Sequence, residues 1–335
     1  MIAYIARRLI LAVFTVWTIS LLAFIIMELP PGDTADKWYE YESISQISHP
    51  SEEEVAAMRA FLGVDKPVMV RYARWASNLM KGQLGMSMQY RSGATMMSVK
   101  SLIGDRLFLT IVLSGFTVLV TWTFAIPVGM YSAVRQHSIG DYTFTLLGFT
   151  GLAVPDFLLG LVLMYLAFAY FDQSVGGLFS QEYINEPWSM AKAVDLLNHL
   201  WIPAAVLGTS GTAGLIRIMR NNLLDELSKP YVVTARAKGL GPVRALLKYP
   251  VRVAINPLVS TVGYLLPSLI SGSVIVSVVL SLPTMGPLLL VAMQTYDYEL
   301  GGFIILMLGV LTVLGTLVSD ILLAVVDPRI KLTRR

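Results

Sequence analysis

Long stretches without a charged side chain constrain this chain more than any other feature. An α-helix needs about 20 apolar residues to cross a bilayer core about 30 Å thick. Several runs in the 335 residues meet that requirement, and only 14% of all residues are charged, against roughly 25% in an average soluble chain. The fold class that the sequence predicts is therefore an all-α polytopic membrane protein.

Dividing these runs predicts six transmembrane helices. The uncharged run from Val253 to Tyr296 is too long for one helix, and a Pro- and Gly-containing segment at 282–287 interrupts it. Its remainder, Leu288–Tyr296, is too short to cross and is expected to form a short re-entrant or interfacial helix. The six predicted spans are Leu9–Leu29, Leu107–Val134, Tyr142–Phe171, Leu200–Ile216, about Asn256–Leu280, and Leu300–Val326.

The distribution of basic residues predicts the orientation, because short cytoplasmic loops carry an excess of Lys and Arg. Basic residues gather before the first span, in the loop 217–252 and in the tail 327–335, whereas the short segments on the other side are mainly acidic. Both termini are therefore expected to be cytoplasmic. A net charge of only +3 implies no nucleic-acid partner, and membrane lipid is the expected surroundings.

The longer segment after the first span, residues 30–106, is expected to be external. Ser51 and Glu54 match a capping box that would open a helix, and Arg71, Trp75 and Leu79 recur at helical spacing. This segment is therefore predicted to fold as a helical subdomain. The domain organisation that follows is an N-terminus with the first span at 1–29, an external (periplasmic) subdomain at 30–106, a five-helix transmembrane core at 107–326 that includes the loop 217–252 and an external re-entrant segment 281–299, and a basic cytoplasmic tail at 327–335.

The sequence argues against an enzyme. There are no cysteines and only three histidines, far apart, so little is left for metal or acid–base chemistry. Gly208–Gly211 matches the G-x-S-G pattern of intramembrane serine proteases, but no histidine follows His199 to serve as the base that Ser210 would need. The chain also lacks the G-x-x-x-x-G-K-[ST] loop that cradles a triphosphate, so energy from ATP would have to come from another subunit. No catalytic residue, cofactor or metal is expected on this chain.

The basic loop 217–252 carries the most informative pattern. Ser228 is suited to cap a helix that has Pro230 in its first turn. Gly239 is suited to end that helix, and Pro242 to open the next one. The loop is thus predicted to be a short helix, a tight turn and a second helix, all outside the bilayer.

One face of the first helix is suited to contact another protein. Tyr231 and Ala235 share a face at i,i+4 spacing. The small side chains of Ala235 and Ala237 would permit close docking into a groove, and Arg236 and Lys238 add charge around the contact. An ordinary basic loop that only marks the cytoplasmic side is the alternative, but it does not account for the helix-stop signals.

The segment Tyr231–Gly239, followed by Ile255-x-Pro257, resembles the coupling-helix signature of bacterial ABC importer permeases. Its Tyr-x-x-Thr-Ala-Arg-Ala-Lys-Gly-Leu form resembles the dipeptide/oligopeptide permease family. Further matches follow in order along nearly the whole chain: Arg7-Arg8, Pro31-Gly32-Asp33, Gly82-x-Leu84-Gly85-x-Ser87, Ile126-Pro127-Val128-Gly129, Asp297-Tyr298 and Asp327-Pro328-Arg329. Three departures from the family pattern are Val233 in place of a glutamate, Leu282–Gly286 in place of Pro-Gly-x-Gly, and Glu299 in place of a proline.

The resemblance implies the type I ABC importer permease fold in the bacterial inner (cytoplasmic) membrane. It implies a permease subunit paired with a homologous second permease subunit, two ATP-binding subunits that carry ATP and Mg, and an external substrate-binding protein that delivers di- or oligopeptides. Oligosaccharides or nickel chelates are alternative cargoes, and an ion-coupled secondary carrier is a less favoured alternative. The residues expected to contact the ATPase are Tyr231, Thr234, Ala235, Arg236, Ala237, Lys238 and Gly239.

Polar residues within two spans are candidates for the substrate pathway. In the fifth span, a stripe at i, i+4, i+8 and i+11 spacing lies on one helix face, with simple helix packing as the alternative. The stripe consists of Ser260, Tyr264, Ser268 and Ser271. Asp156 follows Pro155 in the third span, where a charge is expensive and usually faces protein or water. It is expected either to line the pathway or to partner a polar group, whereas Asp320, near the cytoplasmic end, is expected to act at the interface.

Overall fold

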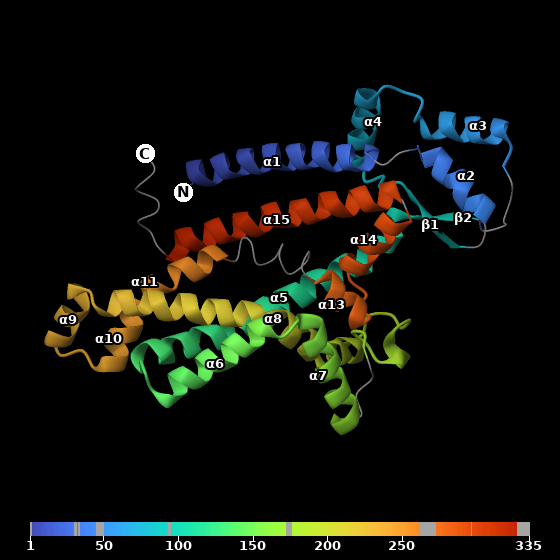
Figure 1. The fold of residues 1–335 in the computed structure, drawn as a ribbon. Helices are drawn as coiled ribbons and strands as arrows, with labels where there is room; N and C mark the ends of the chain where they lie inside the picture. Colours follow the sequence, from blue (N-terminus) through green and yellow to red (C-terminus); the bar gives the residue numbers. More distant parts are fainter. Residues whose placement is uncertain are drawn as a thin grey trace. The chain divides into compact units, whose positions relative to one another are not determined.

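The computed structural model describes residues 2–29, 32, 34–44, 50–92, 95–171, 176–261, 273–295 and 297–326, and most of them are helical (Figure 1). The helices are α1 (Ile2–Glu28), α2 (Thr34–Ile44), α3 (Glu52–Leu62), α4 (Val68–Met80), α5 (Val99–Val134), α6 (Ile139–Ala153), α7 (Asp156–Phe171), α8 (Met190–Leu227), α9 (Pro230–Ala237), α10 (Pro242–Lys248), α11 (Pro250–Ala254), α13 (Val274–Val279), α14 (Met285–Gln294) and α15 (Tyr298–Val326), with a short 3-10 turn at Gln181–Tyr183 and the strands β1 (Met86–Ser92) and β2 (Thr95–Ser98).

The chain divides into two compact units. The first unit comprises Met1–Arg8, Leu109–Pro287 and Leu311–Arg335. The second unit comprises Leu9–Phe108 and Leu288–Val310. The predicted basic tail, 327–335, lies outside the described residues.

Four helices are long and apolar enough to cross a membrane, namely α1, α5, α8 and α15. They coincide with the first, second, fourth and sixth predicted spans. The pair α6 and α7 adds a fifth if it counts as one span. The fifth predicted span is helical at 256–261 and in α13, while 262–272 lie outside the described residues. A count of six therefore stays a prediction.

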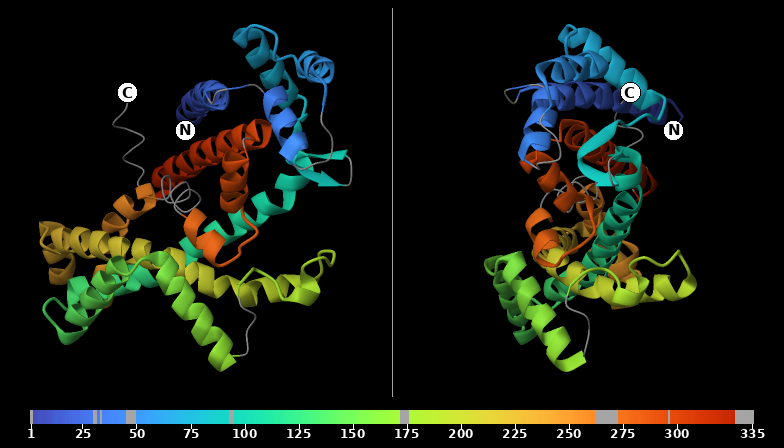
Figure 2. Two further views of the ribbon diagram at one scale, coloured as in Figure 1. Left: turned by 45° about the vertical axis from the view of Figure 1, so that its right-hand side comes forward. Right: turned by 90° about the vertical axis from the view of Figure 1, so that its right-hand side faces the viewer.

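The third predicted span, Tyr142–Phe171, is not one straight helix. It consists of α6 and α7, between which the helix axis bends by 105°; Figure 2 shows the two helices running in different directions. Pro155 offers no backbone N–H and pushes the preceding residue out of the helical region. Val154 accordingly has φ −82° and ψ 127°. The proline therefore breaks the span rather than only weakening it.

The fourth span, predicted over Leu200–Ile216, is much longer in the structure. Helix α8 has 38 residues, which corresponds to about 57 Å at about 1.5 Å per residue. It begins at Ser189, whose side chain accepts a hydrogen bond from the Lys192 N–H at 3.2 Å. The prediction stopped at the first charged residue after the apolar run, but residues 217–227 continue the same helix.

The C-terminal half of α8 belongs to a packed core of the first unit. Buried side chains from α5, α8, α11 and the helical segment 256–261 contribute to this core: Ala125, Ala133, Leu215, Met219, Leu223, Val251, Ala254 and Leu258. Helices α5 and α8 approach closely at Gly129. A Cβ atom there would lie 2.7 Å from the Met219 Cβ and 3.0 Å from the Ile216 carbonyl oxygen. The glycine of the Ile-Pro-Val-Gly string is therefore required by helix packing.

Two ion pairs connect helix ends within the first unit. Arg8 at the start of α1 pairs with Asp320 near the end of α15 at 2.9 Å. Arg220 of α8 binds the Asp141 carboxylate at the start of α6 through two hydrogen bonds of 3.1 and 3.2 Å. A two-point contact of this kind fixes the orientation of both side chains, so α6 is held against α8.

The segment predicted to be external, residues 30–106, is not purely helical, contrary to the prediction. Helix α3 begins at the predicted capping box, in which Ser51 and Glu54 each bond to the other's backbone N–H. Strands β1 and β2, however, form an antiparallel hairpin with Met86 opposite Ser98. The alternation of methionine with polar residues from Met86 to Tyr90, followed by Ser-Gly, is a strand and turn signal that the helix-based interpretation missed.

Helix α4 packs on the end of α1 within the second unit. The rings of Tyr72 and Trp75 lie 5.5 and 5.7 Å from that of Phe24. Tyr72 also shares a hydrogen bond of 2.9 Å with Ser20. The predicted amphipathic helix is therefore confirmed, and its aromatic side covers the last turns of the first span.

The hairpin is joined to the start of α15 by two acidic residues. The Met86 N–H donates to the Glu299 carboxylate at 2.8 Å, and the Ser87 hydroxyl donates to Asp297. Asp297 also accepts from the Leu300 N–H at 3.3 Å. Glu299, a departure from the family pattern, thus fixes the strand that follows α4.

We predict that Gly129→Ala destabilises the protein, because the added methyl group overlaps Met219. Overpacking of this kind costs about 1–3 kcal/mol. The matched control is Gly115→Ala on the same helix, where nothing lies within 4 Å of the added atom. Thermal unfolding of both purified variants tests this, and equal midpoints would contradict the close approach of α5 and α8.

Candidate coupling site

Helix α9 begins directly after α8 ends. Pro230 occupies the first turn of α9, where its missing N–H costs nothing. The residue at the cap position is Lys229, which makes no side-chain cap hydrogen bond. Ser228 instead ends α8 and donates its hydroxyl to the Asp225 carbonyl oxygen at 2.8 Å. The prediction that Ser228 caps the helix containing Pro230 is therefore wrong, because its side chain bonds back to the preceding turn.

The other end of α9 stops at Gly239, as predicted. Gly239 has φ +81°, the left-handed conformation that glycine adopts at low cost. Its N–H donates to the Arg236 carbonyl oxygen at 2.9 Å, and the Leu240 N–H donates to that of Ala235 at 3.3 Å. These two bonds form a Schellman motif, which satisfies the last carbonyl groups of the helix. Pro242 then opens α10.

The faces of α9 differ from the predicted arrangement in one respect. Val232 and Ala235 are only 1% and 6% exposed and form the inner face of the helix, which packs against α10. Ala235 is therefore a packing residue of this loop in the structure rather than part of its outer surface. The apolar i,i+3 spacing of these two residues is a signal that could have identified the buried face. The outer residues are Tyr231, Val233, Thr234, Arg236, Ala237, Lys238 and Gly239.

Tyr231 connects the helix back to α8. Its hydroxyl donates to the carboxylate of Glu226, in the last turn of α8. Burial raises the pKa of the Tyr231 phenol, and the neighbouring carboxylate raises it further. The phenol therefore keeps its proton and remains a donor. Sequence reasoning missed Glu226 because it looked for helical spacing within α9, whereas this pair spans two helices.

The loop is also joined to the transmembrane core. Leu246 of α10 and Ile255 after α11 pack against the core formed by α5, α8 and α11. Val251 and Ala254 of α11 are themselves buried in that core. Figure 1 shows α9 and α10 at the end of α8. Helix α9 is therefore connected to α8 both directly at its own start and through α10 and α11.

The predicted pathway stripe is described at only one position. Ser260 is exposed, and its hydroxyl donates to the Pro257 carbonyl oxygen at 2.7 Å. Tyr264, Ser268 and Ser271 lie outside the described residues.

Asp156 is the first residue of α7, at the break between α6 and α7. A carboxylate in the first turn faces the positive end of the helix dipole. This placement lets the carboxylate stabilise the start of α7, whether or not it also lines the pathway.

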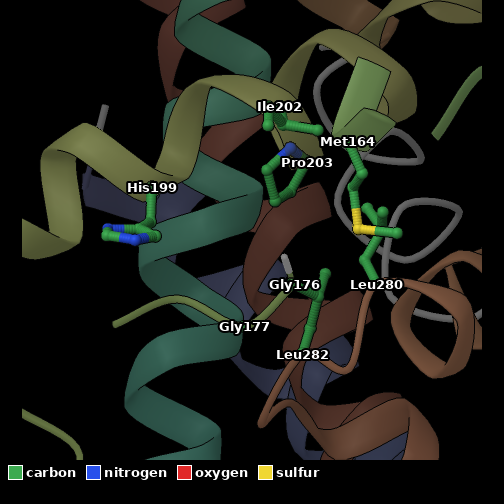
Figure 3. Close-up of a pocket in the computed structure, with 8 residues that line it drawn as sticks. All are labelled: Met164, Gly176, Gly177, His199, Ile202, Pro203, Leu280 and Leu282. Carbon is green, nitrogen blue, oxygen red and sulfur yellow. The ribbon is translucent and has the colours of Figure 1, made fainter. Parts of the chain in front are cut away.

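A small cavity lies at the other end of α8. Met164, Pro203 and Leu280 line it together with the Gly176–Gly177 turn, and the His199 side chain lies at one side (Figure 3). The cavity volume of about 10 Å³ is close to the minimum for one water molecule. It is thus too small for a substrate, and His199 instead contacts the Asp195 carbonyl oxygen at 2.8 Å.

Two family models of the same kind of transport component match different parts of the chain. A family model described as "Binding-protein-dependent transport system inner membrane component" matches residues 125–332, and a model for the N-terminal part of such components matches residues 1–114. The oligopeptide transport system permease protein AppB of Bacillus subtilis (strain 168) is 35% identical over 332 residues, which cover 99% of this chain and 100% of the relative. The dipeptide transport system permease protein DppB of Escherichia coli (strain K12) is 30% identical, with 99% of each chain covered.

A solved structure has a similar fold. A chain of the MetNI methionine ABC transporter, in an inward-facing conformation, aligns with a TM-score of 0.51. The alignment covers 68% of this chain and 97% of that chain at 17% sequence identity. At this identity the likeness concerns the fold alone.

We predict that Gly239→Ala loosens the turn between α9 and α10. A methyl group in the left-handed region costs about 1–2 kcal/mol, so amide hydrogens of residues 231–240 should exchange on the order of tenfold faster. The matched control is Gly241→Ala, because Gly241 has φ −59° and open space around it. Hydrogen-exchange mass spectrometry measures both, and similar exchange in the two variants would contradict the role of Gly239.

Proposed function

The chain belongs to the family of binding-protein-dependent transport system inner membrane components, and we propose from this premise how it works as the permease of a peptide importer. It is a multi-pass inner-membrane subunit of an ABC importer, a transport component rather than an enzyme. Relatives named as oligopeptide and dipeptide permeases match it from end to end. These relatives favour peptides over oligosaccharides, nickel chelates or ion-coupled transport.

The family implies ATPase and substrate-binding partners, and our proposal specifies the assembly further. This permease pairs with a homologous second permease subunit, two ATP-binding subunits dock on the cytoplasmic side, and an external protein delivers the peptide. ATP and Mg belong to the ATP-binding subunits. The absence of a phosphate-binding loop from this sequence supports that division of labour.

The observation that carries the proposal is the short capped helix α9 at the end of α8. Its outer residues Thr234, Ala237 and Lys238 are exposed, and two of them are small. A small side chain lets a helix enter a groove closely. We assign ATPase contact to the outer residues Tyr231, Thr234, Arg236, Ala237, Lys238 and Gly239, with Ala235 supporting them from the buried face.

The coupling mechanism is a shift of population between inward- and outward-facing states. Each ligand moves that equilibrium only by its difference in affinity for the two states. Closure of the ATP-binding pair displaces α9, and the Tyr231–Glu226 hydrogen bond and the packing of α11 carry the displacement into α8. Because α8 is one continuous helix, its membrane portion moves with its end.

The substrate pathway is proposed to follow the polar stripe of the fifth span. Ser260 supports this, since it is exposed between two buried neighbours, Val259 and Thr261. Tyr264, Ser268 and Ser271 continue the same face by helical spacing. Asp156 is proposed to lie beside the pathway at the α6–α7 break.

The external subdomain is proposed to receive the peptide-loaded binding protein. Within the second unit, strand β1 is held by Asp297 and Glu299 at the start of α15. Docking on the hairpin would therefore act directly on the outer end of a spanning helix. The predicted division into an N-terminal span, an external subdomain, a five-helix core and a basic tail is retained in this proposal.

We predict that Ala237→Glu uncouples the importer, since a long acidic side chain would not fit a groove that accepts alanine. Peptide-stimulated ATP hydrolysis should fall on the order of tenfold, the scale of losing a central contact residue. The matched control, Ala237→Ser, keeps a small neutral side chain and should retain coupling.

The measurement is ATP hydrolysis by the assembled transporter in vesicles, with and without the loaded binding protein. Thermal stability of each variant shows that the fold is intact. Full stimulation in Ala237→Glu would contradict the proposed contact.

We predict that Ser260→Cys reacts with a polar thiol reagent and that its labelling rate changes several-fold when the assembly is trapped with ATP. The chain has no other cysteine, so the label reports one position. Thr261→Cys is the neighbouring control, because Thr261 is only 5% exposed and should stay unreactive. A labelling rate at Ser260→Cys that does not change with ATP would contradict the placement of Ser260 in the pathway.

A further inference from the structure

A groove of about 460 Å³ lies between α6 and the C-terminal half of α8. This volume falls within the range of about 300–1,000 Å³ typical of small-molecule sites. It is far larger than the cavity beside His199, and the transport mechanism proposed above does not use it.

One end of the groove is polar and basic. His137, Asp141, Arg217, Arg220 and Asn221 line this end. Asp141 is paired with Arg220 and is almost completely buried. Arg217 is exposed and lies 5.1 Å above the Phe149 ring, and no described carboxylate pairs with it. The polar end therefore keeps an uncompensated positive charge.

The other end of the groove is apolar. Phe144, Gly148, Phe149, Leu152 and Ala213 line it. Ala213 and Arg220 are seven residues apart on α8, or about 10 Å along the helix axis. The groove therefore changes from basic to apolar over roughly the depth at which a lipid changes from headgroup to acyl chain.

The position of the groove matches that gradient. Arg217 is the first charged residue after the predicted fourth span, and Tyr142 begins the predicted third span, so the basic end lies at the cytoplasmic membrane surface. The outer face of α6 is apolar, with Leu146 and Leu147 67% and 61% exposed. Such an exposed apolar face is suited to contact the acyl chains of the bilayer.

We propose that this groove binds one anionic phospholipid of the cytoplasmic leaflet, with its phosphate at Arg217 and an acyl chain along Gly148 and Leu152. Basic pockets between helices on this side of a membrane are suited to anionic headgroups. The bound lipid fills the space between α6 and α8 and braces the half of α8 that leads to α9. The proposal is independent of what the importer carries.

The test is retention of phosphatidylglycerol or phosphatidylcholine by the purified assembly in detergent, measured by native mass spectrometry. The wild type should retain phosphatidylglycerol in preference to phosphatidylcholine. Arg217→Gln should weaken phosphatidylglycerol binding roughly fivefold, the effect of one basic residue at a membrane surface. Arg244→Gln, which removes an exposed charge from α10, is the matched control and should bind as the wild type does.

A second variant probes the apolar end. Gly148→Leu places a side chain in the groove, because Gly148 lines it. A Cβ atom there would be in ordinary contact with Ala213 at 3.5 Å, so the first added atom fits without a clash. It should reduce phosphatidylglycerol retention while leaving the thermal midpoint of the delipidated assembly unchanged. Millimolar inorganic phosphate should not displace the lipid, since the acyl chain contributes to binding.

Three results would overturn the proposal. The first is equal retention by Arg217→Gln and the wild type, and the second is equal retention of the two lipids. The third is efficient cross-linking of Thr145→Cys, in the groove wall, to the second permease subunit, which would make the groove a protein interface.

Discussion

In hydrocarbon, a backbone N–H or C=O group without a partner costs several kcal/mol, so a spanning segment keeps its hydrogen bonds within one helix. This requirement fixes the character of α8. The helix that satisfies it inside the bilayer continues without a break to Leu227. After Pro203, which has no backbone N–H to donate, the structure joins the membrane portion to the loop that contains α9 by one hydrogen-bonded ladder rather than by a flexible linker.

Local contacts hold the loop beyond α8 together. Gly239 closes α9 with two backbone hydrogen bonds, and Tyr231 connects α9 to Glu226. Val232 and Ala235 bury the inner face. The contact with an ATPase proposed for this surface would need such support, because a loop with few buried contacts opens at little cost. The small outer residues are then presented in a fixed orientation.

Sequence patterns predicted the elements whose signals are local. The capping box at Ser51 and the stop at Gly239 are confirmed because each depends on the geometry of a few neighbouring residues. The spans α1, α5 and α15 follow from apolar length alone. The segment proposed to contact the ATPase forms a helix where its sequence predicts one. Ala235, expected on its docking face, is buried, and its burial depends on α10.

The remaining differences come from contacts that no single string displays. Pro155 marks the position of the break between α6 and α7, but the 105° size of the bend cannot be read from one proline. The β1–β2 hairpin is held by Asp297 and Glu299, which lie more than two hundred residues away in the sequence. The pathway stripe beyond Ser260 lies outside the described residues, so its interpretation still rests on spacing.

The unbroken run of α8 has a consequence for how this chain can change. Each residue added to an α-helix rotates everything after it by about 100°. A single insertion or deletion between Met190 and Leu227 would therefore rotate α9 by about 100° relative to the membrane portion of α8. Every side chain of α9 itself would remain unchanged. Insertions and deletions in functional variants of this protein should consequently be confined to the loops. Helix α8 should tolerate substitutions far better than a change in its number of residues.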